Sequence, residues 1–384
     1  MSILTLNSGS SSLKFAIFNT NLEQILKGSF ERINLNNTEF KISDSDSVSF
    51  ENGKNHKECL SYLIKELSKR NISIVGVGHR VVHGGDLFSS PQEINESLLN
   101  EIKSLSSLAP LHQPHNIAGI EAVQLNIPNI KQIAVFDTAF HTTVPIINKM
   151  LPLPRKYFNE KVKSYGFHGL SYDYISRQEE IKRYSRVVVA HLGNGSSACA
   201  LLNNKSHATT MGFTAIDGLM MGTRTGSIDP GVVLHLIDSG LSSKEVSDIL
   251  YKKSGLLGVS GKSSDIRDLI ELSKNGDKYA EEALLMYADK AAAHILRLAS
   301  LMRGIDALVF TAGIGENANI LREMISERLE FIGLEIDKGR NKEKSQSNRK
   351  INSEKSKVDI LIIPTNEEWI IAEAVRNNLI STPY

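Results

Sequence analysis

A turn of glycine, asparagine and serine between two apolar strands is the first candidate for chemistry. Residues 186–203 read as a buried strand, a turn over Gly193 to Ser197, and a second strand. Glycines let the backbone approach a ligand closely, and successive N–H groups in such a turn form a concave anion site. The hydroxyls of Ser196 and Ser197 would add donors. The segment predicts a phosphate-binding hairpin, although an ordinary tight hairpin would have a similar composition.

The same pattern occurs near the start of the chain. Residues 3–19 run from an apolar strand through a turn with Asn7, Ser10 and Ser12 into a second apolar strand that begins near Lys14. Two copies so far apart predict a duplicated domain, with a phosphate hairpin at the start of each half. Two such hairpins facing each other could clamp a polyphosphate from both sides.

Two acidic residues follow buried strands and are candidate metal ligands. Asp137 comes directly after the apolar run 132–136, and Glu367 follows the run 358–364. The active sites of α/β sheets open at the carboxyl ends of parallel strands, and Mg²⁺ takes one or two carboxylates while keeping waters. Alternatively, Asp137 caps a helix, and Glu367 complements the dipole of the last helix.

Basic residues complete a set that suits phosphoryl transfer. Arg80 and Arg224 lie on loops with glycines and offer forked recognition of phosphate or carboxylate, and His168 and His112 offer donors to a moving phosphoryl group. Phosphoryl transfer needs a phosphate cradle, a divalent ion and cationic groups, with little covalent chemistry. Alternatively, the arginines form weak surface ion pairs and His168 is an ordinary loop histidine. The coincidence of these groups with the duplicated hairpin favours phosphoryl transfer.

Other chemistries lack their residue patterns. The nearest match to a Walker A loop, residues 255–263, has one residue too many. No Gly-x-Ser-x-Gly lies between a strand and a helix, so a nucleophile elbow is not indicated. The histidine pairs at 112/115 and 79/83 have no cysteine or glutamate at ligand spacing, which argues against zinc.

Composition sets the class of protein. A chain of 384 residues exceeds what one core usually serves, so two domains are expected. A net charge of +1 gives no electrostatic case for nucleic acid or an anionic membrane. The cysteines, Cys59 and Cys199, are too few for a disulfide framework. Since no apolar run could span a bilayer and Met1 leads directly into a strand, a cytoplasmic enzyme is expected.

The elements that must position these groups repeat in two halves. Apolar periodicity predicts hairpin strands, then helix, strand, helix, strand and helix, first from the start of the chain and again from about residue 186. This order predicts an α/β fold with two mixed sheets. The charged run 338–357 is expected to be a solvated loop.

Seven motifs together resemble the acetate kinase family over nearly the whole chain. They are residues 7–14 (NSGSSSLK), 79–85 (HRVVHGG), 136–141 (FDTAFH), 165–169 (YGFHG), 191–197 (HLGNGSS), 221–224 (MGTR) and 365–368 (TNEE). The resemblance implies the duplicated, ribonuclease H-like fold shared by acetate and sugar kinases, the heat-shock ATPase domain and actin, with the active-site cleft between domains. The domains would be 1–143, completed by the C-terminal helix 369–384, and a nucleotide-binding domain at 144–368.

The resemblance also implies a homodimer that reversibly transfers a phosphoryl group between ATP and acetate, giving acetyl phosphate and ADP. Asn7 and Glu367 would bind Mg²⁺ or Mn²⁺. The residues implied in ATP binding are Lys14, Ser10, Ser12, His191, Leu192, Gly193, Asn194, Gly195, Asp265, Ile266, Arg267, Gly313, Ile314, Gly315, Glu316 and Asn317.

The remaining carried-over residues concern the acceptor and the transition state. Arg80 would hold the acetate carboxylate, and Asp137 would be the essential acidic residue. His168 and Arg224 would stabilise the transition state, and His112 is a further candidate donor. Because a carboxylate is already ionised at pH 7, Asp137 is expected to position metal or substrate more than to move a proton.

The chain departs from the family pattern at four places. Ser227 stands where members have an acidic residue, and Asp217 replaces a glutamate. Residues 112–116 read His-Gln-Pro-His-Asn in place of His-Asn-Pro-Pro-Asn, and Lys262 stands at a small apolar position. None of these removes a named catalytic group, but Ser227 and Lys262 bear on the nucleotide loop and on turnover.

Rival functions remain open. Within the family, the alternative is a propionate or butyrate kinase; Val82 and Leu111 would line the methyl pocket, and a valine leaves little room for another methylene. From another class, the alternative is a non-catalytic ATP-binding module. Such a module would have little use for Arg80, Arg224 and His168. Subunit contact or interdomain packing is expected from the helices after Asp277 and near Trp369.

Overall fold

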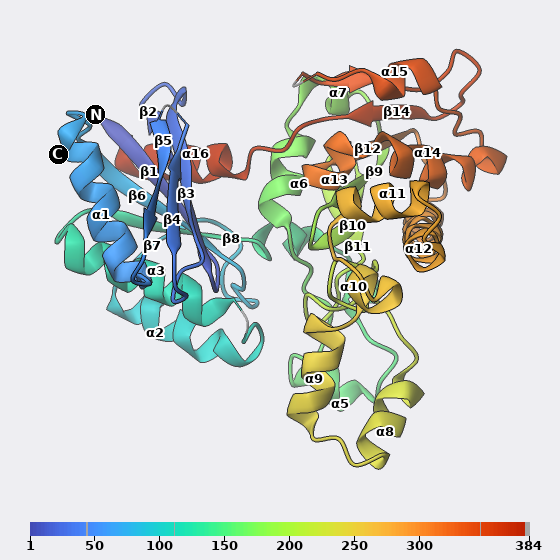
Figure 1. The fold of residues 1–384 in the computed structure, drawn as a ribbon, viewed down its shortest axis with the longest axis horizontal. Helices are drawn as coiled ribbons and strands as arrows, with labels where there is room; N and C mark the ends of the chain where they lie inside the picture. The colour runs from blue at the N-terminus through green and yellow to red at the C-terminus, as the bar shows by residue number, and fades with distance from the viewer. Residues whose placement is uncertain (44, 111, 346, 381–384) are drawn as a thin grey trace. The chain divides into compact units, whose positions relative to one another are not determined.

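The computed structural model describes residues 1–43, 45–110, 112–345 and 347–380, and the chain divides into two compact units (Figure 1). The first unit contains residues 1–142 together with the chain from Asn366 onward. The second unit is Thr143–Thr365. Each unit is built on its own sheet. Leu111, expected in the methyl pocket, lies outside the described residues.

The first unit is a mixed sheet with strand order β5-β4-β3-β2-β1-β6-β8-β7. The central strands β1, β6 and β8 run parallel, and the hairpin strands pair antiparallel. The strands are β1 (Ser2–Ser8), β2 (Ser12–Asn19), β3 (Gln24–Glu31), β4 (Thr38–Ile42), β5 (Ser45–Phe50), β6 (Ile74–Val81), β7 (Gln92–Glu93) and β8 (Gln132–Phe136).

Helices cover the first sheet. An N-cap at Asn55, with Glu58 bonding back to it, starts α1, whose buried Leu60, Leu63 and Leu67 join the core beneath β1–β4. The C-terminal helix α16 contacts β6, β1 and β8, beside which it is drawn in red (Figure 1). The helices are α1 (His56–Lys69), α2 (Glu96–Ser104), η1 (Leu105–Ser107), α3 (Gln113–Asn126), η2 (Ala139–Thr143) and α16 (Glu367–Ile380).

The second unit repeats the topology. Its strand order is β11-β10-β9-β12-β14-β13, in which β11-β10-β9-β12-β14 matches β3-β2-β1-β6-β8 of the first sheet. In both sheets an antiparallel hairpin leads into parallel strands, which confirms the predicted duplication. The strands are β9 (Arg186–Leu192), β10 (Ser196–Leu202), β11 (Lys205–Thr209), β12 (Ala307–Thr311), β13 (Arg349–Lys350) and β14 (Asp359–Ile362).

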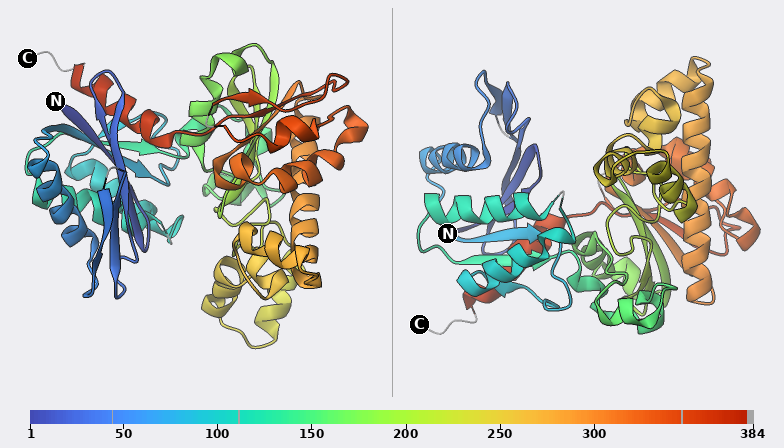
Figure 2. Two further views of the ribbon diagram at one scale, coloured as in Figure 1. Left: turned by 45° about the horizontal axis from the view of Figure 1, so that its top comes forward. Right: turned by 90° about the horizontal axis from the view of Figure 1, so that it is seen from below.

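A long helix, α12, contacts β9, β10 and β11 and runs beside the second sheet (Figure 2). Its buried alanines, Ile295 and Leu298 pack on the apolar residues of β9 and β12. The helices of this unit are α4 (Ile146–Lys149), α5 (Arg155–Asn159), α6 (Gly169–Ser176), α7 (Glu179–Lys182), α8 (Pro230–Asp238), α9 (Ser243–Lys252), α10 (Gly255–Ser260), α11 (Ile266–Lys274), α12 (Lys278–Leu301), α13 (Ala312–Asn317), α14 (Asn319–Glu327), η3 (Glu330–Ile332) and α15 (Lys338–Lys342).

Most described residues of the charged run 338–357 are exposed, and most lie outside helices and strands, as expected of a solvated loop, but the run also has ordered parts. It contains α15 and the edge strand β13. Asn341 and Ile351 within it are fully buried. The expectation is wrong only at these points, where Arg322 binds Asn341 and Ile351 packs in the core. None of the described helices combines the length and apolar character that a membrane crossing requires.

Candidate active site

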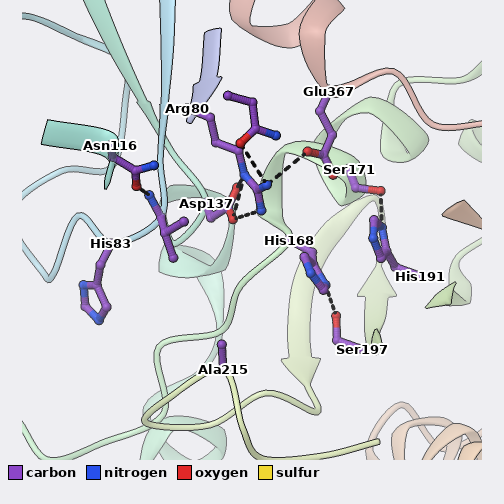
Figure 3. Close-up of polar contacts among 12 residues, drawn as sticks. Arg80, His83, Asn116, Asp137, His168, Ser171, His191, Ser197, Ala215 and Glu367 are labelled. Carbon is purple, nitrogen blue, oxygen red and sulfur yellow. Dashed lines mark hydrogen bonds and ion pairs between the residues drawn. The ribbon is translucent and has the colours of Figure 1, made fainter. Parts of the chain in front are cut away.

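Arg80 and Asp137 form a buried ion pair where two parallel strands of the first sheet end. Arg80 lies near the end of β6, and Asp137 follows the last residue of the neighbouring β8. Arg80 Nη2 donates to Asp137 Oδ2 at 2.6 Å, and Arg80 Nε lies 3.2 Å from both carboxylate oxygens (Figure 3). Asp137 is fully buried. Its carboxylate therefore binds Arg80. The alternative that Asp137 caps a helix is wrong, and so is the alternative that Arg80 forms a weak surface ion pair.

Further oxygen atoms surround the same guanidinium. Arg80 Nη1 lies 3.5 Å from Asn7 Oδ1 and 3.8 Å from Glu367 Oε2. Burial opposes the charge on Arg80, but Asp137 and Glu367 outweigh it and raise the pKa of the guanidinium. Burial and the charge of Glu367 raise the pKa of Glu368, the next residue in α16. Several carboxyl groups thus share one arginine, so the cluster has an excess of negative charge.

This cluster suits a hard divalent cation. The amide oxygen of Asn7 and the carboxylate of Glu367 are oxygen donors of the kind that Mg²⁺ accepts while keeping part of its water shell. Among the residues that the structure describes, no group of three or more His, Cys, Asp or Glu side chains is arranged to hold a metal ion. The chemistry of the donor set and the local acid excess therefore fit Mg²⁺ with few protein ligands, and do not fit a closed structural site.

The other predicted residues of the first unit lie in the β1–β2 hairpin and before α3. Lys14 pairs across the hairpin with Asn7. Ser10 lies in the turn and Ser12 begins β2, where the Ser12 carbonyl accepts the N–H of Gly9. His112 lies directly before α3. The alternative role of Glu367, in which its negative charge complements the dipole of the last helix, is compatible with the structure because α16 begins at this residue.

In the second unit, His168, Arg224 and the hairpin turn converge on Gly195. A β-carbon built on Gly195 would lie 3.6 Å from His168 Nε2 and 3.8 Å from Arg224 Nη1. Because glycine has no side chain, the space between the imidazole and the guanidinium stays open. Two cationic or donor groups beside one glycine turn can stabilise an oxyanion placed there.

Both histidines of this region are anchored through Nδ1. His168 Nδ1 lies 2.8 Å from Ser197 Oγ, and His191 Nδ1 lies 2.8 Å from Ser171 Oγ (Figure 3). The two rings stack with centroids 4.2 Å apart. His168 itself has left-handed backbone angles, with φ 58° and ψ 26°, immediately before α6. Strained residues of this kind persist where the surroundings impose them, often at functional sites.

The serines of the second hairpin do not offer their hydroxyls to a phosphate, so that expectation is wrong. Ser196 Oγ donates to the Gly193 carbonyl at 2.8 Å and contacts the Tyr287 hydroxyl at 2.9 Å. Ser197 is fully buried and contacts His168. Ser196 Oγ also accepts the Gly193 N–H at 3.3 Å. These two hydroxyls are therefore used within the protein, and Ser196 takes one of the backbone N–H groups of the turn.

The loop that carries Arg224 is tied to the hairpin. Arg224 Nη1 donates to the Ala215 carbonyl at 2.9 Å. The Gly222 N–H donates to the Asn194 carbonyl at 3.0 Å, and a β-carbon on Gly222 would fall only 1.9 Å from Asn194 Oδ1. A side chain at this position would require the Asn194 amide to move, so glycine suits the close approach.

Two of the departures from the family pattern meet in this loop. Ser227 Oγ donates to Asp217 Oδ1 at 2.7 Å, and the Gly218 N–H donates to the same carboxylate oxygen at 2.8 Å. Asp217, which replaces a glutamate, and Ser227, which replaces an acidic residue, therefore form a hydrogen-bonded pair. A third departure, Lys262, is half-exposed and lies 3.6 Å from Asp277.

Three predicted nucleotide segments share one cavity of about 950 Å³ in the second unit. Segments around 193, 265 and 313 are far apart in sequence, and each lies at the end of a strand or the start of a helix. The predicted residues that line it are Gly193, Asn194, Asp265, Ile266, Arg267, Gly313, Ile314, Glu316 and Asn317. His191 and Leu192 lie in β9, just before this turn.

Arg322, which the sequence did not single out, holds one wall of this cavity. It is buried, and its Nη1 donates to the carbonyls of Gly315 and Glu316 at 2.9 and 3.0 Å. Its Nε and Nη2 donate to the side chain and the carbonyl of Asn341, both at 2.8 Å. Burial lowers the pKa of Arg322 to about 10. A lone arginine in an amphipathic helix gives no sequence signal for such a role.

Comparison with known proteins gives consistent matches over nearly the whole chain. A sequence model described as the Acetokinase family matches residues 2–373. Acetate kinases of Rickettsia typhi (strain ATCC VR-144 / Wilmington) and Thermoanaerobacterium thermosaccharolyticum are 41% and 42% identical, over 97% of this chain and 98% of theirs.

Solved structures agree. A propionate kinase from Francisella tularensis subsp. tularensis SCHU S4 superposes with a TM-score of 0.93 and 39% identity, over 98% of this chain and 99% of that one. The acetate kinase of Porphyromonas gingivalis superposes with a TM-score of 0.89 and 36% identity, over the same shares of the two chains.

Proposed function

Because this chain belongs to the acetokinase family, we propose that it transfers the γ-phosphoryl group of ATP reversibly to acetate, giving acetyl phosphate and ADP. The observation that carries the proposal furthest is the convergence of His168 Nε2 and Arg224 Nη1 beside Gly195. A phosphoryl group in transfer spreads negative charge over three equatorial oxygens. A hydrogen-bond donor and a guanidinium at one glycine turn match that charge.

The acceptor site is built on Arg80. Its Nε and Nη2 edge is taken by Asp137, so the acetate carboxylate is received by the Nη1 side. The free acetate oxygen attacks the γ-phosphorus in line, and the bond from that phosphorus to the bridging oxygen of ADP breaks. A carboxylate is already ionised at neutral pH, so the attack needs no general base. Asp137 therefore acts by fixing the orientation and charge of Arg80.

Asn7 and Glu367 are the residues that would hold Mg²⁺. A bound divalent ion supplies charge neutralisation on the phosphate oxygens of the nucleotide. Because Glu367 also lies 3.8 Å from Arg80 Nη1, it connects the metal ligands to the acceptor site. Mn²⁺, which favours the same oxygen donors, is expected to substitute.

Each unit carries its own candidate nucleotide contacts. In the second unit the cavity lined by Asp265 and Gly313 takes the nucleoside, and the N–H groups of Asn194 and Gly195 in the hairpin turn take phosphate oxygens. In the first unit, Lys14 and the serine-rich turn of the β1–β2 hairpin take the phosphate end. His112, at the start of α3, is a further donor to the transferred group.

Propionate is the second candidate acceptor, since a propionate kinase is among the structural relatives. Val82, nearly buried after the end of β6, is the described residue proposed for the methyl pocket. One methylene changes discrimination by only about 1–3 kcal/mol, so propionate is expected to react more slowly than acetate and butyrate more slowly still. A non-catalytic module is disfavoured by membership in a family of phosphotransferases.

We also propose a homodimer in the cytoplasm. Helix α8 has no buried residue, and its Val232, Leu234 and Ile237 are 40%, 62% and 45% exposed. Such an apolar surface suits a contact with a second copy, beside the contribution expected from the helices after Asp277. Both cysteines are free and buried, as in proteins of a reducing compartment. Sedimentation of Leu234→Asp beside the unsubstituted protein tests the dimer; a monomer in both would refute it.

The direct test is turnover of acetate with Mg-ATP, with acetyl phosphate trapped by hydroxylamine, beside propionate and butyrate. Arg224→Ala and Asp137→Ala are expected to lose activity by at least about a hundredfold, the usual cost of removing a group that stabilises transition-state charge. The matched control is Arg177→Ala, which removes an arginine paired with Asp173 on the surface of α6. Binding of ATP without turnover of any of the three acids would refute the proposal.

A further inference from the structure

Two helices of the first unit hold neighbouring carbonyl groups at the turn of the β1–β2 hairpin. His56, the first residue of α1, has its Nε2 2.8 Å from the carbonyl oxygen of Gly9. Asn116, in α3, donates from Nδ2 to the Ser8 carbonyl at 2.9 Å and accepts the Val82 N–H through Oδ1 at 3.0 Å (Figure 3). Both side chains are buried. The end of β1 is therefore tied to α1 and to α3 from inside the unit.

The direction of the His56 bond follows from its acceptor. A carbonyl oxygen only accepts hydrogen bonds, so Nε2 carries the donated proton whether the ring is neutral or protonated. Burial lowers the pKa of His56, and the bond to Gly9 opposes this effect only in part. The ring is therefore neutral near pH 7, with its proton on Nε2.

The ring of His115 lies against that of His56. Their centroids are 5.9 Å apart and their planes differ by 21°. His115 is half-buried in the first turn of α3, directly before Asn116, at a position where the family pattern has a proline. Burial and the charge of a protonated His56 lower the pKa of His115, so the stack is neutral near pH 7. The second ring covers one face of the first and limits its rotation.

The other carbonyl groups of the turn are also bound within the unit. The Ser11 carbonyl accepts the Ile33 N–H at 2.9 Å, and the Ser12 carbonyl accepts the Gly9 N–H at 2.8 Å. Ser10 and Ser11 are exposed. Because carbonyl oxygens repel an anion, a turn whose carbonyls are bound internally is suited to offer N–H and hydroxyl groups to one.

The peptide group between Gly9 and Ser10 shows what the His56 bond does. In a trans peptide the C=O of one residue and the N–H of the next point in opposite directions. With the Gly9 carbonyl directed at His56, the Ser10 N–H points away from α1. Rotation of this peptide group would place a carbonyl oxygen where the N–H had been, and so replace attraction of an anion by repulsion.

We propose that His56, seated by His115, is a positioning residue that holds the first hairpin turn in shape to bind phosphate oxygens of the nucleotide. Its bond to the Gly9 carbonyl keeps the Ser10 N–H available as a donor. The inference rests on the proposed function for the identity of the anion. It also gives His115, one of the departures from the family pattern, a role in this chain.

The test is calorimetric titration of the full chain with Mg-ATP. His56→Met keeps a long side chain and removes the donor, whereas His56→Gln keeps an amide N–H that can replace Nε2–H. We expect the Kd for Mg-ATP to rise about fivefold in His56→Met, the effect of one lost hydrogen bond, and to stay within about twofold in His56→Gln. The KM for ATP should follow Kd, while kcat and the KM for acetate stay within about twofold of the parent because the proposed acceptor site is untouched.

Controls separate the turn from general stability. Leu67→Val shortens a core side chain near the far end of the same helix, and should lower the free energy of unfolding without changing Kd. His115→Ala should raise the Kd for Mg-ATP by about threefold through loss of the ring contact. His115→Phe keeps a ring and should match the parent.

Hydrogen exchange without nucleotide reports on the turn itself. The Gly9 N–H, which donates to the Ser12 carbonyl, is expected to exchange about fivefold faster in His56→Met than in the parent, because the turn opens more often. The same N–H should exchange at the parent rate in His56→Gln and in Leu67→Val.

Two outcomes overturn the inference. One is an unchanged Kd for Mg-ATP and unchanged Gly9 exchange in folded His56→Met. The other is a rise of Kd in His56→Gln and Leu67→Val as large as in His56→Met, which would show that the effect comes from lost stability. If His56→Met does not fold, equal Kd values in His115→Ala and His115→Phe overturn the inference instead. If Kd and exchange behave as expected but no acid is phosphorylated, the proposed function fails and the role of His56 stands.

Discussion

Replacing Arg322 by methionine should weaken the second unit and its proposed nucleotide cavity together, while leaving the proposed acceptor site of the first unit intact. Arg322 donates four hydrogen bonds, to the carbonyls of Gly315, Glu316 and Asn341 and to the Asn341 side chain. These bonds fasten the end of α13 to α15. Methionine fills similar volume but donates nothing, so four acceptors in buried or partly buried bonds would lose their partner.

The magnitude follows from two opposing contributions. Burial lowers the pKa of Arg322 from 12.5 to about 10, which corresponds to about 3 kcal/mol spent on burying the charge. Hydrogen bonds from a charged donor contribute about 1.5–3 kcal/mol each, so four of them exceed that cost by at least about 3 kcal/mol. We therefore expect Arg322→Met to lower the free energy of unfolding by about 3 kcal/mol, and to raise the Kd for ATP by about tenfold because the wall at Gly315 relaxes.

The assays are urea unfolding and calorimetric titration with ATP, with KM for acetate measured separately. Arg328→Met is the matched control, since Arg328 follows the same helix and pairs with the exposed Asp289; it should cost less than about 1 kcal/mol. Arg322→Met with unchanged unfolding and unchanged ATP affinity would refute the reasoning. A rise in KM for acetate as large as that in Kd for ATP would show that the effect is not confined to the nucleotide wall.

Three other predictions follow from single groups. Gly195→Ala should leave the melting temperature unchanged, because the added β-carbon would find ordinary contact distances. The same change should lower kcat by about a hundredfold, because the methyl group occupies the space between His168 and Arg224. Normal turnover would contradict the proposed place of the phosphoryl group. Ser326→Ala should keep or raise the free energy of unfolding by up to about 1 kcal/mol, because among the described residues its buried hydroxyl has no hydrogen-bond partner; a clear loss in calorimetry would contradict this. Burial lowers the pKa of His79 to about 4, so the unfolded state binds a proton at a higher pH than the folded state. The free energy of unfolding should therefore fall by up to about 3 kcal/mol as the pH drops from 6.5 to 4. Urea midpoints measured across this pH range test the slope, which His79→Gln should reduce.

The periodic elements of the fold could be predicted because their causes are local. The alternation of apolar residues in the two hairpins, and the apolar faces of helices such as α1, are readable along the chain. The repeat of hairpin and strand also predicted two related sheets, and both show the order hairpin, then parallel strands. Expectations failed where side chains from distant segments intervene: Arg322 binds Asn341 and buries it within the run 338–357, most of which is exposed as expected.

The candidate residues could be proposed by type and place, but their partners could not. Asp137 at the end of a strand was equally compatible with a helix cap, and only the parallel pairing of β6 with β8 brings it to Arg80. Ser197 was expected to face a phosphate, yet the pleat of β10 turns its hydroxyl inward to His168.

By itself the sequence determined which residues are available and which local elements hold them: the glycine turns, the strand ends and the motif residues of the acetokinase family. Local periodicity and turn chemistry act within a few residues, so they can be read directly from the sequence. The tertiary structure decided which of those residues meet, which nitrogen of His168 is anchored, and that Arg322 supports the cavity proposed for the nucleotide. Such contacts join segments tens to hundreds of residues apart, and their geometry exists only once the strands have paired and the core has closed.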